Sequence, residues 1–311
     1  MDLSIIVVNY NDGKVLPRCL ASLERARKEL ALEVTVVDNG STDGSIEEAT
    51  AAHEDFRFIR TGTNLGFAGA NNLGLRESNG RHVMLLNPDT EVLPGALSKL
   101  VLALDAHPTW GVVGPKMLDG RGRAYRAARR FPTPYRLFCE CTRLVYLFPR
   151  TRLFGGYFYG EQHIDHLDTV DQIEGSALVI RDTVRREIGD LDEQFFLFFE
   201  EVDWCKRVRD TGFEIHVVSD AQIKHYRATT MTRIFLESRK ANARSALRYF
   251  AKHHGDAGVR SLRRWMIAAL WIRQVIGSLA AVFALSPLAK LRAEGARVER
   301  QVYREGLGSC A

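Results

Sequence analysis

The sequence predicts an α/β fold with a mostly parallel central sheet, helices on both of its faces, and basic and apolar helices at the C-terminal end. Strand and helix patterns alternate over the first sixty residues in the order β-α-β-α-β, which is typical of a parallel sheet with right-handed crossovers. Some strands, such as Val83–Leu86, are short apolar runs, as expected of buried strands. With 311 residues, we expect one domain at 1–230 and a helical, membrane-associating region at 231–311.

The first strand is the β-branched apolar run Leu3–Val8, and a polar turn follows it at 9–13. The segment 15–30 carries apolar residues at helical spacing, with Pro17 in its first turn, a position that proline favours. The same patterns predict a strand at 33–37, a helix at 46–53 and a strand at 56–59.

A glycine-bearing loop at 64–72 then leads into a helix that runs through Leu75. The start of such a helix presents free N–H groups and can hold phosphate. The loop is not a dinucleotide-binding fingerprint, because no G-x-G-x-x-G follows the first strand and G-x-x-x-x-G-K-[ST] does not occur.

The next strand, Val83–Leu86, runs into Asn87, Pro88 and Asp89. Since Pro88 cannot donate to a strand ladder, the strand ends there. Asp89 therefore lies at the carboxyl end of a buried strand, the edge at which open α/β sheets bind ligands. A carboxylate there can hold the divalent cation that a diphosphate needs. The alternative is that Asp89 caps the following helix, predicted at 94–107.

Between 117 and 168 the periodic pattern is lost. Five arginines fall within ten residues, ending at Arg129 and Arg130. They would suit a diphosphate group beside a nucleotide pocket, and a solvated loop is the alternative. The segment 131–168 is rich in aromatic residues, which favours a mobile lid or an acceptor groove.

Regular patterns return at Val170, with a strand that ends at Arg181 and a short helix through Ile188. A further strand is predicted at 214–218. His225 follows before a turn, and a lone histidine is more often structural than a metal ligand, so both alternatives stay open.

Three acidic residues, Glu200, Glu201 and Asp203, directly follow a run of five apolar residues. Buried carboxylates are costly unless they are solvated, paired or used in function. A helix at 201–212 would place Asp203 near Arg207. The alternative is an acidic first turn that the helix dipole favours.

The C-terminal region is basic and apolar. The segment 234–250 is an amphipathic basic helix, and the apolar segment 266–285 is interrupted by Arg273. An arginine at the centre of a membrane span costs about 2.5–3.5 kcal/mol. A helix or hairpin lying on an anionic leaflet therefore fits better than a span. Packing of 266–285 on the domain, away from a membrane, is the third alternative.

Charge is distributed unevenly along the chain. The net charge is +5, but residues 233–304 hold 15 Lys/Arg against 4 Asp/Glu. This asymmetry indicates a region that meets anionic phosphate, or else a solvated helical surface. Because no nucleic-acid recognition motif accompanies it, we expect a membrane surface and no nucleic acid as partner.

The five cysteines lack the spacing of zinc ligands, which indicates reduced thiols in a cytosolic protein. The N-terminus enters a strand without the basic region and cleavage site of a signal peptide. We therefore expect a cytoplasmic protein.

Eight segments in series resemble the family 2 glycosyltransferases, specifically the rhamnosyltransferase-like branch of bacterial cell-wall and surface-polysaccharide assembly. The resemblance covers roughly residues 3–230. It implies the GT-A nucleotide-diphospho-sugar transferase fold, a divalent metal (Mg²⁺ or Mn²⁺) and an inverting reaction. The segments are SIIVVNYN at 4–11, VVDNGSTDGS at 36–45, NLGFAGANN at 64–72, LLNPDT at 85–90, GPKMLDGRGR at 114–123, RRFPT at 129–133, EGSALVIR at 174–181 and FFLFFEEVDWCKRVRDTGF at 195–213.

The resemblance assigns donor-site roles to four residues. Asn9 and Asp38 lie at the strand ends where the family holds the nucleoside. Asn64 and the loop at Gly66 would border the nucleotide and its diphosphate.

The resemblance also implies a metal site and an acceptor site. Asp89 is the last residue of the branch's version of the D-x-D motif and would ligate the metal. Asn87 replaces the first acid, as is usual in the branch, so diphosphate oxygens and water must complete the coordination shell. His225 matches a position at which some relatives supply a metal-binding histidine. Gly175 and Ser176 are expected to bind the acceptor.

The general base of the branch is usually the second residue of E-D-V-D, where this chain has Glu201. A glutamate can accept a proton from an acceptor hydroxyl within hydrogen-bond reach. Asp203 and Glu200 are the alternatives for this role.

For substrates, the branch favours dTDP-rhamnose as donor and a glycan or a polyprenyl-diphosphate-linked acceptor. The enzyme would then work at the inner face of the bacterial plasma membrane, as a peripheral protein.

A sugar-phosphate nucleotidyltransferase is an alternative, but it would need a G-x-G-T-R-type loop where 9–13 stands. A catalytically impaired sugar-nucleotide- or polysaccharide-binding protein is a further alternative, and Glu201 is its only support.

Overall fold

The computed structural model describes residues 1–159, 169–227, 235–282 and 289–307. Contacts divide the described chain into two units, each of which is treated by itself. The first lies within 1–129, 164–196 and 200–230, and the second within 130–163, 197–199 and 231–311. The boundary expected at residue 230 stays a prediction.

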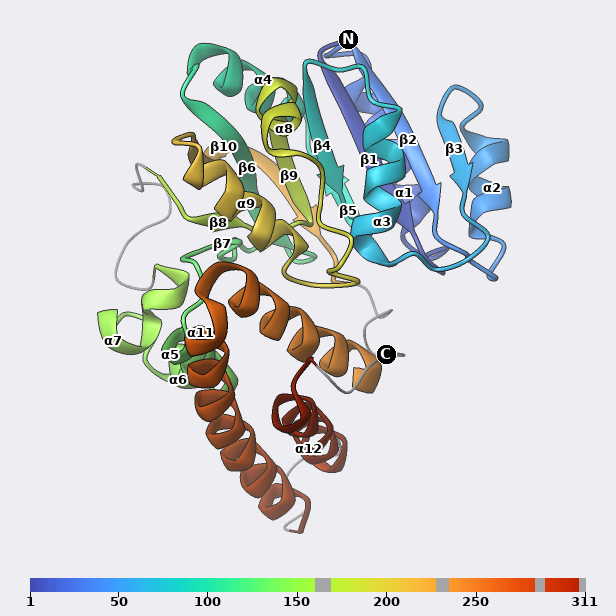
Figure 1. Ribbon diagram of the computed structural model, residues 1–311. Helices are drawn as coiled ribbons and strands as arrows, with labels where there is room; N and C mark the ends of the chain where they lie inside the picture. Colours follow the sequence, from blue (N-terminus) through green and yellow to red (C-terminus); the bar gives the residue numbers. More distant parts are fainter. Residues whose placement is uncertain (160–168, 228–234, 283–288, 308–311) are drawn as a thin grey trace. The chain divides into compact units, whose positions relative to one another are not determined.

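An eight-stranded sheet forms the centre of the first unit (Figure 1). Its strands are β1 (Leu3–Asn9), β2 (Leu32–Asp38), β3 (Arg57–Arg60), β4 (His82–Leu86), β5 (Thr90–Val92), β6 (Trp110–Asp119), β9 (Ala177–Arg181) and β10 (Glu214–His225). They lie in the order β3-β2-β1-β4-β9-β6-β10-β5. Parallel pairs join β3 to β2, β2 to β1, β1 to β4 and β6 to β10, whereas β9 and β5 run antiparallel to their neighbours. The predicted α/β class with a mostly parallel sheet is confirmed.

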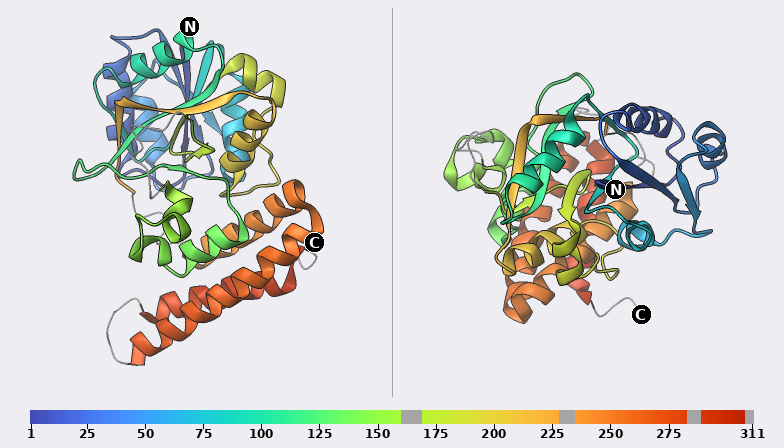
Figure 2. Two further views of the ribbon diagram at one scale, coloured as in Figure 1. Left: turned by 90° about the vertical axis from the view of Figure 1, so that its left-hand side faces the viewer. Right: turned by 90° about the horizontal axis from the view of Figure 1, so that it is seen from above.

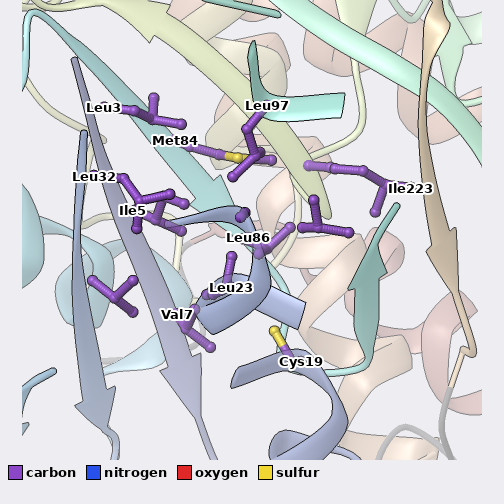
Figure 3. Packing of buried hydrophobic residues seen from close by; sticks show 14 of the residues in the cluster. Leu3, Ile5, Val7, Cys19, Leu23, Leu32, Met84, Leu86, Leu97 and Ile223 are labelled. Carbon is purple, nitrogen blue, oxygen red and sulfur yellow. The ribbon is translucent and has the colours of Figure 1, made fainter. Parts of the chain in front are cut away.

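Helices cover both faces of this sheet. They are α1 (Leu16–Ala26), α2 (Ser45–Ala52), α3 (Gly66–Arg76), α4 (Ala96–Ala106), α8 (Asp182–Ile188) and α9 (Glu200–Asp210). Because strand side chains alternate between faces, Leu3 and Ile5 pack in one core with side chains of α1 and α4, among them Leu23 (Figure 3). On the opposite face Ile6 lies against α3. A Cβ at Gly74 would be 2.6 Å from Ile6 Cγ2, so glycine is required for this close approach.

Several strand features were not predicted, the ten-residue strand β6 among them. β5 is only three residues long, too short for a periodic pattern to identify. β10 continues beyond the predicted end at 218, across a register shift between Val218 and Gln222. A small second sheet pairs β7 (Ala128–Arg129) with β8 (Gln172–Ile173). This pairing holds two segments that are far apart in sequence next to each other.

The second unit begins with short helices in the segment 131–168, for which the sequence pattern predicts no regular elements. They are α5 (Pro134–Cys141), α6 (Leu144–Leu147), α7 (Arg152–Gly155) and the 3-10 turn η1 (Gly156–Phe158). Aromatic side chains contact one another, as in the pairs Tyr146–Phe158 and Phe148–Phe154. Residues 160–168 of that segment lie outside the described residues, and the lid or groove expected there stays a prediction.

Two long helices complete the second unit. α11 (Phe235–Val282) bends at Gly255, whose φ of 58° is not helical, and α12 (Ala289–Glu305) packs along it (Figure 2). α11 joins the predicted helix at 234–250 to most of the predicted apolar segment 266–285. By length and composition, α11 is the one helix among the described residues that could cross a membrane.

Candidate active site

The carboxyl ends of β1 and β2 are joined by side chains. Asn9 and Asp38 are register partners, and Asn9 Nδ2 donates to Asp38 Oδ1 at 3.0 Å. The same amide nitrogen lies within 3.0 Å of the hydroxyl groups of Ser41 and Ser45. Both Asn9 and Asp38 are buried. The two predicted nucleoside-site residues therefore form one rigid group at the sheet edge.

Asn39 extends this group to the predicted phosphate loop. Its Nδ2 donates to Asn64 Oδ1 at 3.0 Å and to the carbonyl of Gly66 at 3.1 Å. Its Oδ1 accepts from the backbone N–H of Leu65 at 2.8 Å. Asn39 was not predicted as a site residue. The one signal for it in the sequence is its position directly after Asp38, in the turn that ends the strand.

Gly66 begins α3 with a φ of +78°. A Cβ at this position would lie 2.4 Å from the carbonyl oxygen of Phe196, and that oxygen accepts from the N–H of Phe67 at 2.7 Å. Glycine is required here because L side chains rarely adopt this φ and because no space exists for one. The contact fixes the start of α3 against the residues that precede α9.

Asp89 and His225 are brought together from the ends of β4 and β10. Asp89 Oδ1 lies 3.1 Å from His225 Nε2, and the Asp89 carbonyl accepts from the N–H of Tyr226 at 2.8 Å. The N–H of Asn87 donates to the carbonyl of Ser176 at 2.9 Å. The antiparallel pairing of β4 with β9 thus places the predicted donor and acceptor segments beside each other.

Glu174 holds the opposite side of the histidine ring. The Tyr125 hydroxyl donates to Glu174 Oε1 at 2.6 Å and lies 2.8 Å from His225 Nδ1. The Ser176 hydroxyl donates to the same carboxylate at 2.7 Å, and Arg129 forms an ion pair with its Oε2 at 3.6 Å. None of these contacts was predicted, because Glu174, Tyr125 and Arg129 are spread over fifty residues and meet only through the β7–β8 pairing.

These contacts set the charges of the two central groups. Burial would raise the pKa of Glu174, but its contacts to His225, Arg129, Tyr125 and Ser176 lower it to about 2. Burial would lower the pKa of His225, but hydrogen bonds to Asp89 and Glu174 raise it to about 9. The protein without metal therefore holds a protonated histidine between two carboxylates at neutral pH.

A divalent metal fits the Asp89–His225 pair. A proton on Nδ1 faces Tyr125 and Glu174, which leaves Nε2 as the nitrogen directed at Asp89 and able to ligate a metal once its own proton leaves. One carboxylate oxygen and one imidazole nitrogen form a donor set that suits Mn²⁺. Within the described residues, no group of three or more His, Cys, Asp and Glu side chains could hold a metal, so other ligands must come from substrate and water.

Glu201 lies at the start of α9, beside the predicted acceptor segment. A Cβ at Gly175 would lie 3.4 Å from Glu201 Cβ and 3.7 Å from the ring of Phe67. Glu201 is partly exposed, yet its Oε2 is buried without a hydrogen-bond partner among the residues described. Burial raises the pKa of Glu201, against the opposing charge of Arg129. A carboxylate with a raised pKa can accept a proton from a hydroxyl within hydrogen-bond reach.

The two alternatives to Glu201 have different surroundings. Glu200 is buried and, like Glu201, has a buried Oε2 without a hydrogen-bond partner among the residues described. Burial together with the neighbouring Glu201 raises its pKa well above the ordinary value. Asp203 is fully buried and accepts from Arg207 Nε at 2.9 Å, the contact that helical spacing predicted. Arg207 also donates to the backbone carbonyl of Asp190 at 2.7 Å, which anchors α9 to the preceding loop.

The predicted arginine cluster is dispersed. Arg123 pairs with Asp119 at 2.8 Å, and Arg130 belongs to the second unit, where it stacks on Tyr159. Arg129 contacts the site through Glu174. A further guanidinium, that of Arg227, stacks 4.0 Å above the ring of Tyr125 and was not predicted.

Comparison with known proteins places this arrangement in context. The model of the family described as "Glycosyl transferase family 2" matches residues 4–186, which is more than half of the chain. The match contains Asn9, Asp38 and Asp89, whereas Glu201 and His225 lie beyond it.

Two curated relatives are similar over most of the chain. The N-acetylglucosaminyl-diphospho-decaprenol L-rhamnosyltransferase of Mycobacterium tuberculosis is 29% identical over 277 residues, covering 85% of this chain and 89% of the relative. The low-salt glycan biosynthesis hexosyltransferase Agl10 of Haloferax volcanii is 28% identical over 236 residues, covering 75% of this chain and 69% of the relative.

A solved structure shares the fold. The mannosyltransferase PcManGT from Pyrobaculum calidifontis, in complex with GDP-Man and Mn²⁺, superposes with a TM-score of 0.60. The superposition covers 99% of this chain and 88% of that one, at 18% sequence identity. At this identity the likeness concerns the fold.

Proposed function

The chain belongs to glycosyl transferase family 2, and we propose that it is an inverting, metal-dependent enzyme that moves a sugar from a nucleotide-diphospho-sugar to a hydroxyl group of a glycan acceptor. The family and the GT-A fold confirm the predicted resemblance. The observation that supports the proposal is that two features border the same segment, residues 174–176. These are the Asp89–His225 pair, which suits a metal, and the Glu201 carboxylate, which has an unpaired buried oxygen among the residues described.

The donor half of the site is the group at the ends of β1 and β2. We assign Asn9 and Asp38 to the nucleoside, because a buried carboxylate at a strand end can accept from a base or a ribose. Asn64 and the Gly66 loop border the nucleotide. The N–H groups of Leu65, Gly66 and Phe67, which the sequence suggested would be free for phosphate, instead donate to Asn39, Asn64 and Phe196 and hold the shape of the loop. Asn87 follows β4 next to Asp89 and borders the diphosphate.

The metal-dependent part of the mechanism rests on Asp89 and His225, which would hold Mg²⁺ or Mn²⁺. When bound, the cation would supply positive charge to the diphosphate. Arg227 and Arg129 add fixed positive charge near this edge. Charge that develops on the departing diphosphate is thereby stabilised without reorganisation of the protein.

Transfer proceeds by one displacement. The acceptor hydroxyl gives its proton to Glu201, its oxygen forms the bond to the anomeric carbon, and the bond from that carbon to the diphosphate oxygen breaks with its electron pair on the leaving nucleoside diphosphate. Gly175 and Ser176 border Glu201 and Glu174 and are assigned to the acceptor. The absent side chain at Gly175 leaves the space that a sugar hydroxyl would need beside Glu201.

For substrates, the L-rhamnosyltransferase relative supports rhamnose as the transferred sugar, and we retain dTDP-rhamnose, the donor that the resemblance implies. The relative's name also states a decaprenol-linked substrate, which favours a polyprenyl-diphosphate-linked acceptor here. Such an acceptor lies in a membrane, so we assign the enzyme to the inner face of a bacterial plasma membrane as a peripheral protein.

The proposal is tested with a panel of nucleotide sugars, with and without Mg²⁺ or Mn²⁺. A true donor raises the melting temperature of the protein by mass action, and the rise should require the metal. Glu201→Gln should bind this donor normally yet lose transfer, because a carboxamide cannot accept the proton. Transfer by Glu201→Gln at a near-normal rate would show that another group is the base. Donor binding by the wild-type protein with neither transfer nor hydrolysis would favour a binding protein instead.

A further inference from the structure

The second half of α11 carries a largely exposed apolar stripe, whose first residue, Trp265, also packs against Tyr135 and Phe138 of α5. Along 265–282, six large apolar side chains are exposed. They are Trp265, Trp271, Val275, Ile276, Leu279 and Val282. Helical geometry places them within an arc of about 140°. The stripe is about 26 Å long, from the rise per residue of an α-helix.

The opposite side of the same helix is buried. Met266, Leu270 and Gly277 face the interior of the second unit. A Cβ at Gly277 would lie 3.1 Å from Cβ of Ala293 on α12. α11 and α12 are therefore packed closely together, and the apolar stripe is the side of α11 that this packing leaves uncovered.

Arg273, the one charged residue between 265 and 282, does not lie on the stripe. Its guanidinium lies 3.9 Å from the Cys141 sulfur. Burial raises the pKa of Glu299 on α12, and Arg239 and Arg273 oppose that rise. Glu299 is 1% exposed and pairs with Arg239. Arg273, which argued against a membrane span, is thus directed into an internal ion cluster.

The outer side of α12 has the opposite character. Its exposed residues are polar, with Arg297 and Arg304 among them. A membrane-spanning arrangement of α11 and α12 together would carry these charges into hydrocarbon, which is costly. Only one side of the helix pair can therefore enter a membrane.

The charges at the ends of the stripe indicate the charge of the surface that it would contact. Arg260 and Arg264 are exposed at its N-terminal end, and Lys290 and Arg292 begin α12 at the other. Cations that flank an apolar, tryptophan-bearing helix face match an anionic leaflet, where they meet headgroups while the apolar residues enter the acyl boundary.

We propose that the stripe 265–282 docks the protein onto an anionic lipid surface, with α11 and α12 lying in the plane of the leaflet rather than crossing it. This proposal rests on the proposed function in one respect: docking would hold the enzyme where a lipid-linked acceptor lies.

The test is binding to vesicles of phosphatidylcholine with and without phosphatidylglycerol, measured by cosedimentation of the full chain. The wild type should bind the anionic vesicles, more weakly at high salt. Ile276→Glu with Leu279→Glu should reduce binding at least tenfold. Leu102→Glu, a comparably exposed position on α4 of the first unit, should leave it unchanged. Equal binding by the double variant and the wild type would overturn the proposal.

Tryptophan quenching by brominated lipid provides a measurement on the wild type, in case the double variant does not fold. Emission should be quenched, and Trp271→Phe should remove a large part of the effect. Protein that resists extraction by high salt and alkali would indicate a span and overturn the in-plane arrangement. A stable dimer that ignores vesicles would indicate a second copy of the chain as the occupant. Donor-induced thermal shift, measured without vesicles, tests the proposed function separately.

Discussion

Glu174 Oε1 lies 3.5 Å from Nδ1 of His225, whereas Nε2 of the same ring faces Asp89 at 3.1 Å. The imidazole is thus held at both nitrogens. Glu174 sets the orientation of the ring, and its own carboxylate is held by Ser176 and Tyr125. A metal that binds at Nε2 would find the ring already positioned.

The first prediction concerns this support. Glu174→Gln should weaken Mn²⁺ binding about 10–100-fold, as loss of a group that orients a metal-ligating histidine commonly does. The measurement is titration calorimetry, or electron paramagnetic resonance of free Mn²⁺. Glu47→Gln, at an exposed ion pair with Arg60 on the same unit, is the control and should bind Mn²⁺ like the wild type. Unchanged affinity in Glu174→Gln would remove the positioning role.

A second prediction concerns pH. Burial raises the pKa of Glu201, and a base works only when it is deprotonated. The rate of transfer should therefore increase with pH and level off above a pKa that is higher than the ordinary glutamate value. Glu201→Asp should retain part of the activity with a displaced profile. The same acidic limb in the residual activity of Glu201→Gln would assign the limb to a different group.

The strands and helices of the first unit could be predicted where the residues within one element form a recognisable local pattern. Leu3–Val8 is buried on both faces and is apolar except for Ser4, and the polar residues Asn9 and Asp38 mark where such strands end. Residues that repeat a pattern over a few positions contain the information for an element. β5 was not predicted because its three residues are too few to show a repeating pattern.

The support around the metal pair could not be predicted, for a physical reason. Tyr125, Arg129 and Glu174 meet His225 only because the two-residue strands β7 and β8 pair across more than forty residues. No local pattern encodes such a contact. The orientation of Arg273 in the second unit could not be predicted either. Its charge was visible in the sequence, but its direction, toward Cys141 and not toward the stripe, depends on how α5, α11 and α12 pack.

A third prediction tests the start of α3. Gly66→Ala should lower the free energy of unfolding by about 2–4 kcal/mol, because it adds left-handed strain to a collision with the Phe196 carbonyl. Gly122→Ala is the matched control. Gly122 has a φ of +79°, but a Cβ added there would have no atom within 4 Å, so strain alone should cost about 1–2 kcal/mol. Urea denaturation measures both, and equal losses would exclude the collision as a cause.

The last prediction separates Asp203 from the general base. Asp203 is fully buried against Arg207, so Arg207→Ala leaves a buried carboxylate without this partner and should destabilise the protein by about 3–5 kcal/mol. Lys206→Ala breaks the exposed pair with Asp210 on the same helix and should change stability by less than about 1 kcal/mol. Asp203→Asn should likewise lower stability, while the folded fraction keeps most of its turnover. Loss of a general base lowers kcat and leaves stability unchanged. Loss of a structural anchor lowers stability and leaves the kcat of the folded fraction largely unchanged. Full stability with turnover as low as that of Glu201→Gln would make Asp203 the base.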